Sequence, residues 1–340
     1  MKVAVLSPVA WRTPPRHYGP WEQIASNITE GLVQKDIDVT LFATKDSVTS
    51  AKLASIIPKG YEEDKNTDAK VSECMHISYL MERANKFDII HNHFDFHPLT
   101  YSRLIRTPVV TTIHGFSSPK IIPVYKRYND SNYYVSISYS DRNENLSYIA
   151  NVYHGIKEED FTFQEDPAGG YLLFFGRIHP DKGVWEAIQI AKKSGKKIVL
   201  AGIIQDQAYF DEKIAPWIDN EQICFLGPAG PEKRNKLLGD AHALLHPIRF
   251  NEPFGLSLAE SMMCGTPVIA FNKGAMQELI NDGETGFLVD TIDEAVAKIP
   301  LISQLSRLKC HEWAKSQFSR KRMVDDYIKV YEKILRKAKS

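Results

Sequence analysis

Two glutamates that stand eight positions apart form a pair that could do chemistry. They are Glu252 and Glu260, within RFNEPFGLSLAE at residues 249–260. Paired carboxylates can carry out acid and base catalysis, or they can accept hydrogen bonds from neighbouring hydroxyls of a sugar. A Pro and a Gly follow the first glutamate, and an apolar helical pattern surrounds the second. We therefore expect Glu252 in a loop and Glu260 on a helix.

The residues between the two glutamates are expected at the start of that helix. ALLHPI predicts a strand, RFNEPFG a loop, and LSLAESMMCG an amphipathic helix that ends at Gly265. Phe254, Gly255 and Leu256 would then offer backbone amides to a phosphate or a sugar hydroxyl. An acidic residue that only stabilises the helix dipole would explain Glu252, but it explains the Pro-Phe-Gly loop less well. The segment predicts one carboxylate for a hexose and one for a ribose.

A second loop supplies positive charge. GRIHPDKG, residues 176–183, follows the apolar run YLLFFG and presents Arg177 and Lys182 between two glycines. Two cations at the end of a strand could neutralise a diphosphate. A solvated turn with two ordinary surface cations is the alternative.

Short apolar runs, separated by helical patterns, are the elements that must position these loops. KVAVLS, DVTLFAT, FDIIHNHF and PVVTTIHG lie in the first half, and IASNITEGLVQK between the first two has a helical pattern. YLLFFG, KKIVLAG, QICFLG, ALLHPI and TPVIAF follow a turn-rich break at FTFQEDPAGGY. Runs of this kind are typical of buried strands in parallel sheets with helical crossovers. The sequence therefore predicts an α/β protein with two doubly wound, Rossmann-like domains, and ligands at the strand ends facing the cleft between them.

Three segments follow from this pattern. Residues 1–165 are expected to form the first domain and residues 166–312 the second, and residues 313–340 to form amphipathic helices that pack back on the first. The final stretch from Phe318 carries eight Lys or Arg against three Asp or Glu, a net charge of +5. A packed helix with a solvated basic face is the favoured interpretation, and weak peripheral contact with an anionic membrane is the alternative.

The composition excludes several classes of function. The 340 residues are 43% hydrophobic, enough for two cores, and 42 basic residues balance 42 acidic ones, which argues against nucleic acid as a partner. The four cysteines form no C-x-x-C pair, so reduced thiols in a cytoplasmic protein are expected. No secretory signal is recognised, and no run reaches the roughly 18 apolar residues that span a bilayer.

Taken in order, GRIHPDKG and EPFGLSLAE resemble the motifs of the retaining GT-B glycosyltransferases of family four, the group related to glycogen synthase and sucrose synthase. THG at residues 112–114 and NKGAMQELINDGETGFLV support the resemblance, which covers essentially the whole chain. It implies a GT-B fold and transfer of a hexose, most simply glucose, from a nucleotide diphosphate sugar, most simply UDP-linked. The acceptor would be a hydroxyl of a saccharide or a lipid-linked glycan, as in polysaccharide biosynthesis, and no metal or other cofactor is implied.

The resemblance also implies roles for individual residues. Arg177 and Lys182 would bind the diphosphate and stabilise the leaving group. Glu260 would bind the ribose, while Glu252 and the amides of Phe254, Gly255 and Leu256 would hold the hexose and the distal phosphate. His114 would contact the donor sugar from the first domain, and Ala229 would offer its backbone to the base. Glu252 is interpreted as a binding carboxylate and not as a glycosidase-like nucleophile.

The N-terminal loop departs from the family pattern. Members often have two adjacent glycines after the first strand, whereas here Gly19 is followed by Pro20. Proline has no N–H to donate, so one amide contact to the donor is in question, although Gly19 could still serve. Pro20 would equally suit the first turn of the following helix. Trp11, Tyr18 and Trp21 in the same loop could stack on an acceptor sugar.

Other interpretations are weaker. His91, His93, Asp95 and His97 alternate along a predicted strand and could line the acceptor cleft or, less well, hold a metal. The Asp-x-Asp of a GT-A enzyme occurs only before a strand, and neither G-x-G-x-x-G nor a P-loop is present. A GT-B sugar-nucleotide epimerase and a non-catalytic sugar-nucleotide sensor stay open as alternatives to the transferase.

Overall fold

The protein folds into two units, each built on its own parallel sheet. A computed structural model describes residues 1–16 and 18–337. The first unit holds residues 1–155 together with the segment from Arg320, and the second holds Ile156–Ser319. The chain crosses between units at Gly155, ten residues before the boundary at 165 expected from the sequence. Lys339, one of the cations counted in the basic tail, lies outside the described residues.

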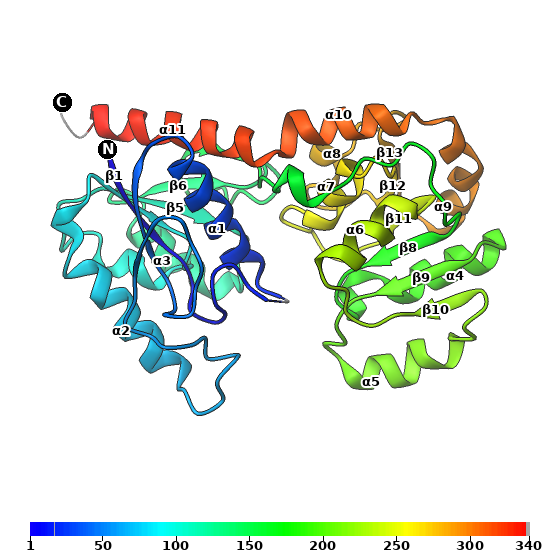
Figure 1. The fold of residues 1–340 in the computed structure, drawn as a ribbon, viewed down its shortest axis with the longest axis horizontal. Coiled ribbons are helices and arrows are strands. Elements are labelled where there is room, and N and C mark those ends of the chain that lie inside the picture. Colours follow the sequence, from blue (N-terminus) through cyan, green and yellow to red (C-terminus); the bar gives the residue numbers. More distant parts are fainter. Residues whose placement is uncertain (17, 338–340) are drawn as a thin grey trace. The chain divides into compact units, whose positions relative to one another are not determined.

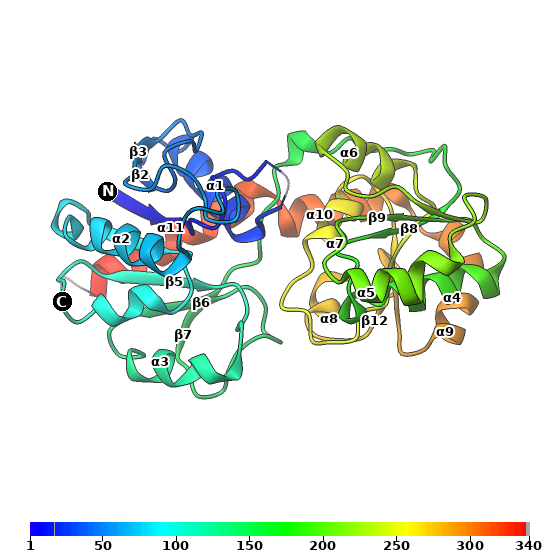
Figure 2. The same cartoon turned by 90° about the horizontal axis from the view of Figure 1, so that it is seen from below.

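In the described chain, the first unit has a seven-stranded sheet in the order β3-β2-β1-β4-β5-β6-β7. Every neighbouring pair is parallel, and Figure 2 shows β5, β6 and β7 in sequence along it. The strands are β1 (Lys2–Leu6), β2 (Asp38–Phe42), β3 (Lys52–Ala54), β4 (Ile89–Asn92), β5 (Val109–Ile113), β6 (Tyr133–Ser136) and β7 (Tyr148–Asn151).

Helices cover this sheet because their apolar faces need a partner. The last helix, α11, lies beside α1 and buries Met323, Val324, Tyr327 and Tyr331 within the first unit (Figure 1). The helices are α1 (Pro20–Val33), α2 (Ala69–Met81), η1 (Ala84–Lys86), η2 (His97–Tyr101), η3 (Pro119–Ile121), α3 (Ile122–Arg127) and α11 (Arg320–Lys337).

The second unit has a six-stranded parallel sheet over its described residues, in the order β10-β9-β8-β11-β12-β13. The five strands predicted here from apolar runs are confirmed, and β13 is an addition. The strands are β8 (Leu172–Phe175), β9 (Ile198–Ala201), β10 (Ile223–Phe225), β11 (Ala243–His246), β12 (Val268–Phe271) and β13 (Gly286–Val289).

Helices again pack on the sheet of the second unit. Helix α4 contacts β8 and β9, whereas α7 contacts β11 and β12 and is itself covered by α10. The elements are η4 (Glu158–Asp160), η5 (Pro180–Lys182), α4 (Val184–Ser194), α5 (Gln207–Tyr209), η6 (Phe210–Ile214), η7 (Ala215–Trp217), α6 (Pro231–Asp240), α7 (Leu256–Met263), α8 (Met276–Leu279), α9 (Ile292–Lys298), η8 (Ile299–Gln304) and α10 (Arg307–Phe318).

Two parallel-sheet, Rossmann-like α/β domains are thus confirmed. Strands β8 and β11 are direct neighbours, so the loops that follow them leave the sheet at the same edge. In the described part of the chain, no helix has the length and apolarity needed to cross a membrane. All four cysteines are free thiols.

Candidate functional site

Lys182 and Glu252 meet in the second unit, in the loops after β8 and β11. Lys182 Nζ donates a hydrogen bond to Glu252 Oε2, and the two side chains are only 13% and 14% exposed. The loops are also joined through the backbone, because Arg249 N donates to the Asp181 carbonyl at 2.8 Å. The structure therefore brings one predicted cation and one predicted carboxylate into direct contact.

A third loop holds the Glu252 backbone in place. Ala275 N donates to the Glu252 carbonyl at 2.9 Å. Gly274 just before it has φ +58°, and a Cβ built there would lie 2.4 Å from both the N and the O of Glu252. No side chain fits in that space, so the glycine allows the NKGA loop to approach Glu252 closely.

His246 is a neighbour of Glu252 that the sequence reasoning missed. It is the last residue of β11, and its Nε2 lies 3.8 Å from Glu252 Oε2. Burial, and secondarily the Lys182 charge, lowers the pKa of His246 to about 3, so the ring is neutral. Among the described residues, this buried Nε2 has no hydrogen-bond partner. A histidine that ends a strand just before the loop could have signalled this position.

The helix start predicted between the two glutamates is confirmed, since α7 begins at Leu256 and ends at Met263. Gly255 caps it with φ +107°. Phe254 is buried, with its ring edge-on to Phe318 at 5.7 Å between centroids. The amides of the first helical turn have no partners within the helix and can bind an anion.

Glu260 lies on α7 and pairs with Arg234 of α6, a residue that the sequence reasoning did not select. Arg234 Nη1 donates to Glu260 Oε1 at 3.1 Å, and its guanidinium lies over the Phe161 ring at 4.8 Å. Burial raises the pKa of Glu260, while the Arg234 charge acts in the opposite direction. Arg234 stands in a markedly polar helix, which gave no sign that it faces inward.

Arg177 lies in the loop after β8 and Ala229 in the loop after β10, and β9 stands between these two strands. Arg177 Nη1 donates to Oε1 of Gln205, a residue that follows β9 and was also not selected. Gln205 N donates to the Ile178 carbonyl at 3.2 Å, which fixes the two loops against each other. Ala229 is half-buried between β10 and α6. The five positions singled out in the E-x7-E segment thus belong to the same unit as Arg177, Lys182 and Ala229.

His114 lies in the first unit, directly after β5, within a row of buried imidazoles. Its Nε2 is 3.0 Å from His93 Nδ1, its Nδ1 is 3.1 Å from His154 Nε2, and Trp21 stacks on it at 5.3 Å between centroids. Burial holds the pKa of His93 and His114 well below the usual value and lowers that of His154 to about 3. Neutral rings can be hydrogen-bonded in a row only with one consistent direction of donation.

His91 belongs to a different network. Its Nδ1 is 2.6 Å from the Tyr331 hydroxyl and its Nε2 is 2.7 Å from Thr112 Oγ1, which in turn lies 2.6 Å from the Tyr327 hydroxyl. This network ties α11 to β4 and β5. The expectation that four alternating polar residues share one strand face is wrong, because β4 ends at Asn92.

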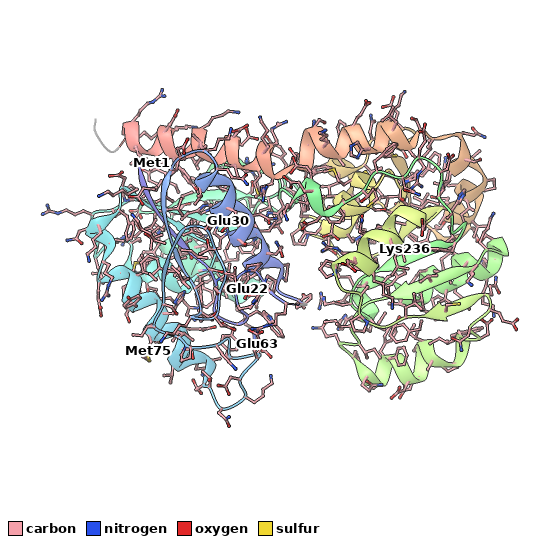
Figure 3. The ribbon with its side chains drawn as sticks, in the orientation of Figure 1. Met1, Glu22, Glu30, Glu63, Met75 and Lys236 are labelled. Carbon is pink, nitrogen blue, oxygen red and sulfur yellow. The ribbon has the colours of Figure 1, made fainter. Side chains whose placement is uncertain are left out.

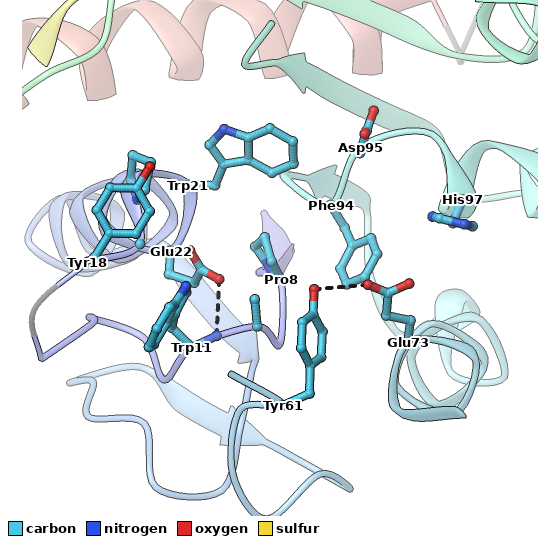
Figure 4. A pocket seen from close by; sticks show the side chains of 13 residues that line it. Pro8, Trp11, Tyr18, Trp21, Glu22, Tyr61, Glu73, Phe94, Asp95 and His97 are labelled. Atoms are coloured by element: carbon cyan, nitrogen blue, oxygen red, sulfur yellow. Dashed lines mark hydrogen bonds between the residues drawn. The ribbon is translucent and has the colours of Figure 1, made fainter. Parts of the chain in front are cut away.

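Gly19 immediately precedes α1, and Pro20 is the first residue of that helix, as the sequence allowed. Gly19 has φ +150°, and a Cβ there would lie 2.9 Å from Glu22 Oε2 and 3.2 Å from Trp11 Cδ1. It lines a cavity of about 400 Å³ (Figure 4). The cavity walls come from the loops after β1 and β4 and from α1 and α2, and the three aromatic residues singled out in the N-terminal loop all contribute.

The described residues include no group of three or more His, Cys, Asp or Glu placed to hold a metal ion. His93, His114 and His154 are linked ring to ring, and His91 is bonded to two hydroxyl groups. His76 Nε2 lies 2.9 Å from the Ser7 carbonyl oxygen.

Residues 155–320 match the family model of glycosyl transferases group 1. An uncharacterized glycosyltransferase of Methanocaldococcus jannaschii is 23% identical over 339 residues, with 85% of each chain covered. The D-inositol 3-phosphate glycosyltransferase of Rhodococcus opacus is 38% identical over 163 residues, which is 43% of this chain and 36% of the relative. The chain spans only 31% to 46% of the length of the Rhodococcus opacus relative and of six further curated relatives.

Solved structures of similar fold superpose on nearly the whole chain. The sucrose-phosphate synthase of Thermosynechococcus elongatus superposes with a TM-score of 0.78 at 16% identity, covering 98% of this chain and 99% of that one. Anabaena HepE in complex with UDP and glucose has a TM-score of 0.73 at 17% identity, covering 98% and 99%. These neighbours establish the GT-B fold, and the comparisons do not favour an epimerase or a non-catalytic sensor. Residues 155–320 therefore resemble the group 1 glycosyl transferases, and the chain as a whole shares the GT-B fold of the solved structures.

Proposed function

We propose that the protein transfers a hexose, glucose in the simplest case, from a UDP-linked donor to a hydroxyl group with retention of configuration. The acceptor would be a saccharide or a lipid-linked glycan. The solved structures of HepE with UDP and with UDP-glucose support the choice of donor by analogy of fold. Basic residues on α11 would suit a lipid-linked acceptor through weak contact with an anionic membrane.

The contact between Lys182 and Glu252 beside the start of α7 is the observation that carries this proposal. An ammonium, a carboxylate and free helix amides then share one edge of the sheet, the place where an α/β fold binds its ligands. A phosphate would be drawn to the ammonium and the amides. The carboxylate would accept hydrogen bonds from hydroxyls of the hexose. This combination fits a sugar joined to a diphosphate better than it fits either part alone.

The leaving group would be stabilised by two cations. Arg177 and Lys182 stand in the loop after β8 and would neutralise the negative charge that develops on the departing diphosphate. Donor binding would draw Lys182 from Glu252, which frees the carboxylate for the hexose. Glu260, oriented by Arg234, would bind the ribose, and Ala229 would lie along the base. His114 and Gly19 would contribute contacts to the donor from the first unit.

The test is acceptor-dependent release of UDP from UDP-glucose, with the anomeric configuration of the product read by proton NMR. Arg177→Ala and Lys182→Ala should each lower turnover by about 10²- to 10³-fold, the usual effect of removing one group that stabilises developing charge. Lys236→Ala is the matched control, because this lysine of α6 is 80% exposed and its ion-pair partner in the described part of the chain is Asp240 (Figure 3). Wild-type turnover in both test variants would refute the assigned roles.

Incubation of UDP-glucose without an acceptor adds a second readout. A transferase should leave the donor largely intact or hydrolyse it slowly. Accumulation of an epimer would contradict the proposal and assign an epimerase instead.

A further inference from the structure

The cavity of the first unit has a lining of aromatic rings and carboxyl groups. Five Trp, Tyr and Phe side chains line it, namely Trp11, Tyr18, Trp21, Tyr61 and Phe94 (Figure 4). Its volume of about 400 Å³ falls within the range of small-molecule pockets, about 300–1,000 Å³. Flat aromatic faces can pack against the apolar C–H face of a pyranose ring, and carboxylates can accept hydrogen bonds from its hydroxyls.

The carboxyl groups come from three different elements. Glu22 stands on α1, Glu73 on α2, and Asp95 in the loop after β4. Glu22 accepts a hydrogen bond from the Trp11 backbone N–H at 3.3 Å, and Glu73 accepts one from the Tyr61 hydroxyl at 3.1 Å. Asp95 accepts hydrogen bonds from two hydroxyl groups outside the cavity. Among the described residues none of the three is bonded to a cation, so the carboxylates of Glu73 and Asp95 add negative potential to the cavity.

No Lys or Arg is found among the described residues that line the cavity, and His97 is the one basic side chain. Arg16, a nearby cation of the same loop, is held outside by Asp46 and Glu63 at 3.2 Å and 2.6 Å. Burial raises the pKa of Glu22 to about 7, and the carboxylate of Glu63 adds to that rise. Figure 3 shows Glu22 on α1 with Glu63 beneath it.

We propose that this cavity binds the acceptor as a sugar ring that bears no phosphate or carboxylate. That the bound sugar is the acceptor rests on the proposed function, but the binding of a sugar in this cavity does not require a donor. Phosphate or carboxylate groups on the ring would face Glu73 and Asp95 without any lining cation to compensate. The chain would therefore differ in acceptor charge from its Rhodococcus relative, whose name specifies D-inositol 3-phosphate.

Ligand-observed NMR, without nucleotide, tests the proposal. The neutral probes are the methyl glycosides of glucose, galactose and mannose, and the matched anionic probes are glucose 6-phosphate and methyl glucuronide. At least one neutral glycoside should show saturation transfer from the protein and bind at least tenfold more tightly than both anionic probes. Tighter binding of either anionic probe, or no binding of any neutral glycoside, would overturn the proposal.

Variants locate the binding. Trp11→Ala should abolish the signal from the neutral glycoside, whereas Trp11→Phe should retain most of it because an aromatic face remains. Trp185→Phe is the control, since this tryptophan lies on α4 in the second unit and is 38% exposed. Glu73→Gln should reduce the difference in affinity between the anionic probes and the neutral glycoside. A signal that survives in Trp11→Ala would place the sugar elsewhere and refute the proposed cavity.

A titration with UDP separates this proposal from the proposed function. Trp11→Ala should bind UDP like the wild type, because the residues assigned to the base, the ribose and the diphosphate, namely Ala229, Glu260, Arg177 and Lys182, lie in the second unit. If UDP fails to bind the wild type while neutral glycosides bind at the cavity, the donor assignment falls and the cavity stands. If UDP binds but neutral glycosides do not, the cavity proposal alone is refuted.

Discussion

Gly274 offers the sharpest test of how Glu252 is positioned. Replacement by Ala places a Cβ where it would meet Glu252 N and O at 2.4 Å, about 1 Å closer than ordinary van der Waals contact at 3.4 Å or more. Backbone cannot yield as a side-chain tip does, so the Glu252 loop must move by roughly that distance. The hydrogen bond from Ala275 N to the Glu252 carbonyl would be distorted with it. Misplacement by about 1 Å can cost on the order of 100-fold in rate.

Gly283→Ala is the matched control for this variant. Gly283 also has a left-handed backbone, with φ +79° against +58° for Gly274, but a Cβ there meets nothing within 4 Å. Both variants should lose about 1–2 kcal/mol of stability from the unfavourable backbone region. Only Gly274→Ala should also weaken UDP-glucose binding, by at least tenfold in calorimetry. Equal donor affinities for the two folded variants would refute the assignment of Glu252 to the donor site.

Three further predictions concern stability. Tyr331→Phe removes the hydroxyl bonded to His91 Nδ1 at 2.6 Å and should lower the free energy of unfolding in urea by about 1–3 kcal/mol. An unchanged free energy of unfolding would contradict the role of this bond in anchoring α11. Arg307→Met removes hydrogen bonds to the Gln164, Gly239 and Ala241 carbonyls and to Thr266 Oγ1, and should lower the free energy of unfolding by at least about 2 kcal/mol. The control Arg336→Met, at an arginine whose side chain is 81% exposed, should lower it by less than about 0.5 kcal/mol. Similar losses in the two variants would contradict this prediction. Burial lowers the pKa of His76 to about 4 in the folded protein, whereas the unfolded chain keeps a value near 6.5. Below about pH 6.5 the unfolded chain therefore binds one proton more than the folded protein, and the free energy of unfolding decreases as the pH is lowered. His76→Gln should remove about 1.4 kcal/mol per pH unit of that slope between pH 6 and 4.5, and parallel curves for the two proteins would speak against it.

Most of the strands could be predicted because each is a short apolar run buried on both faces. KVAVLS and TPVIAF lie in sheet interiors, and every residue of β12 is buried. The two edge strands of the first sheet escaped this reasoning for the opposite reason, whereas β10, an edge strand of the second sheet, was predicted. β3 at one end of its sheet has two exposed residues and one partly buried residue, and β7 at the other end is only half-buried.

The crossing between units shows what residue composition misses. The Gly- and Pro-rich break at FTFQEDPAGGY has no regular structure, yet it is bonded to the second unit. Gln164 N donates to the Cys264 carbonyl at 3.0 Å, and Gly169 N donates to the Asp240 carbonyl at 3.0 Å. The crossing itself, at Gly155 and Ile156, has no such composition to mark it.

The sequence motifs predicted the loops and the helix that carry the candidate site residues, but not the side chains that contact those residues. Loops and helix starts follow from local patterns, so the positions of Glu252 and Glu260 could be foreseen. Their partners were not foreseen: Arg234 of α6 contacts Glu260, and His246 at the end of β11 lies beside Glu252. Gln205, after β9, contacts Arg177. These contacts depend on the order of strands in the sheet, and that order is not written in any local pattern.

The most direct test of the donor site compares UDP with uridine by calorimetry on the wild type, Lys182→Ala and Glu260→Ala. Uridine carries the ribose that Glu260 would bind, and UDP adds the diphosphate that Lys182 would bind. The account predicts that Glu260→Ala weakens both ligands and that Lys182→Ala removes most of the extra affinity of UDP while uridine binds as before. Unchanged binding of both ligands in both variants would contradict a nucleotide-sugar site at this edge of the second sheet.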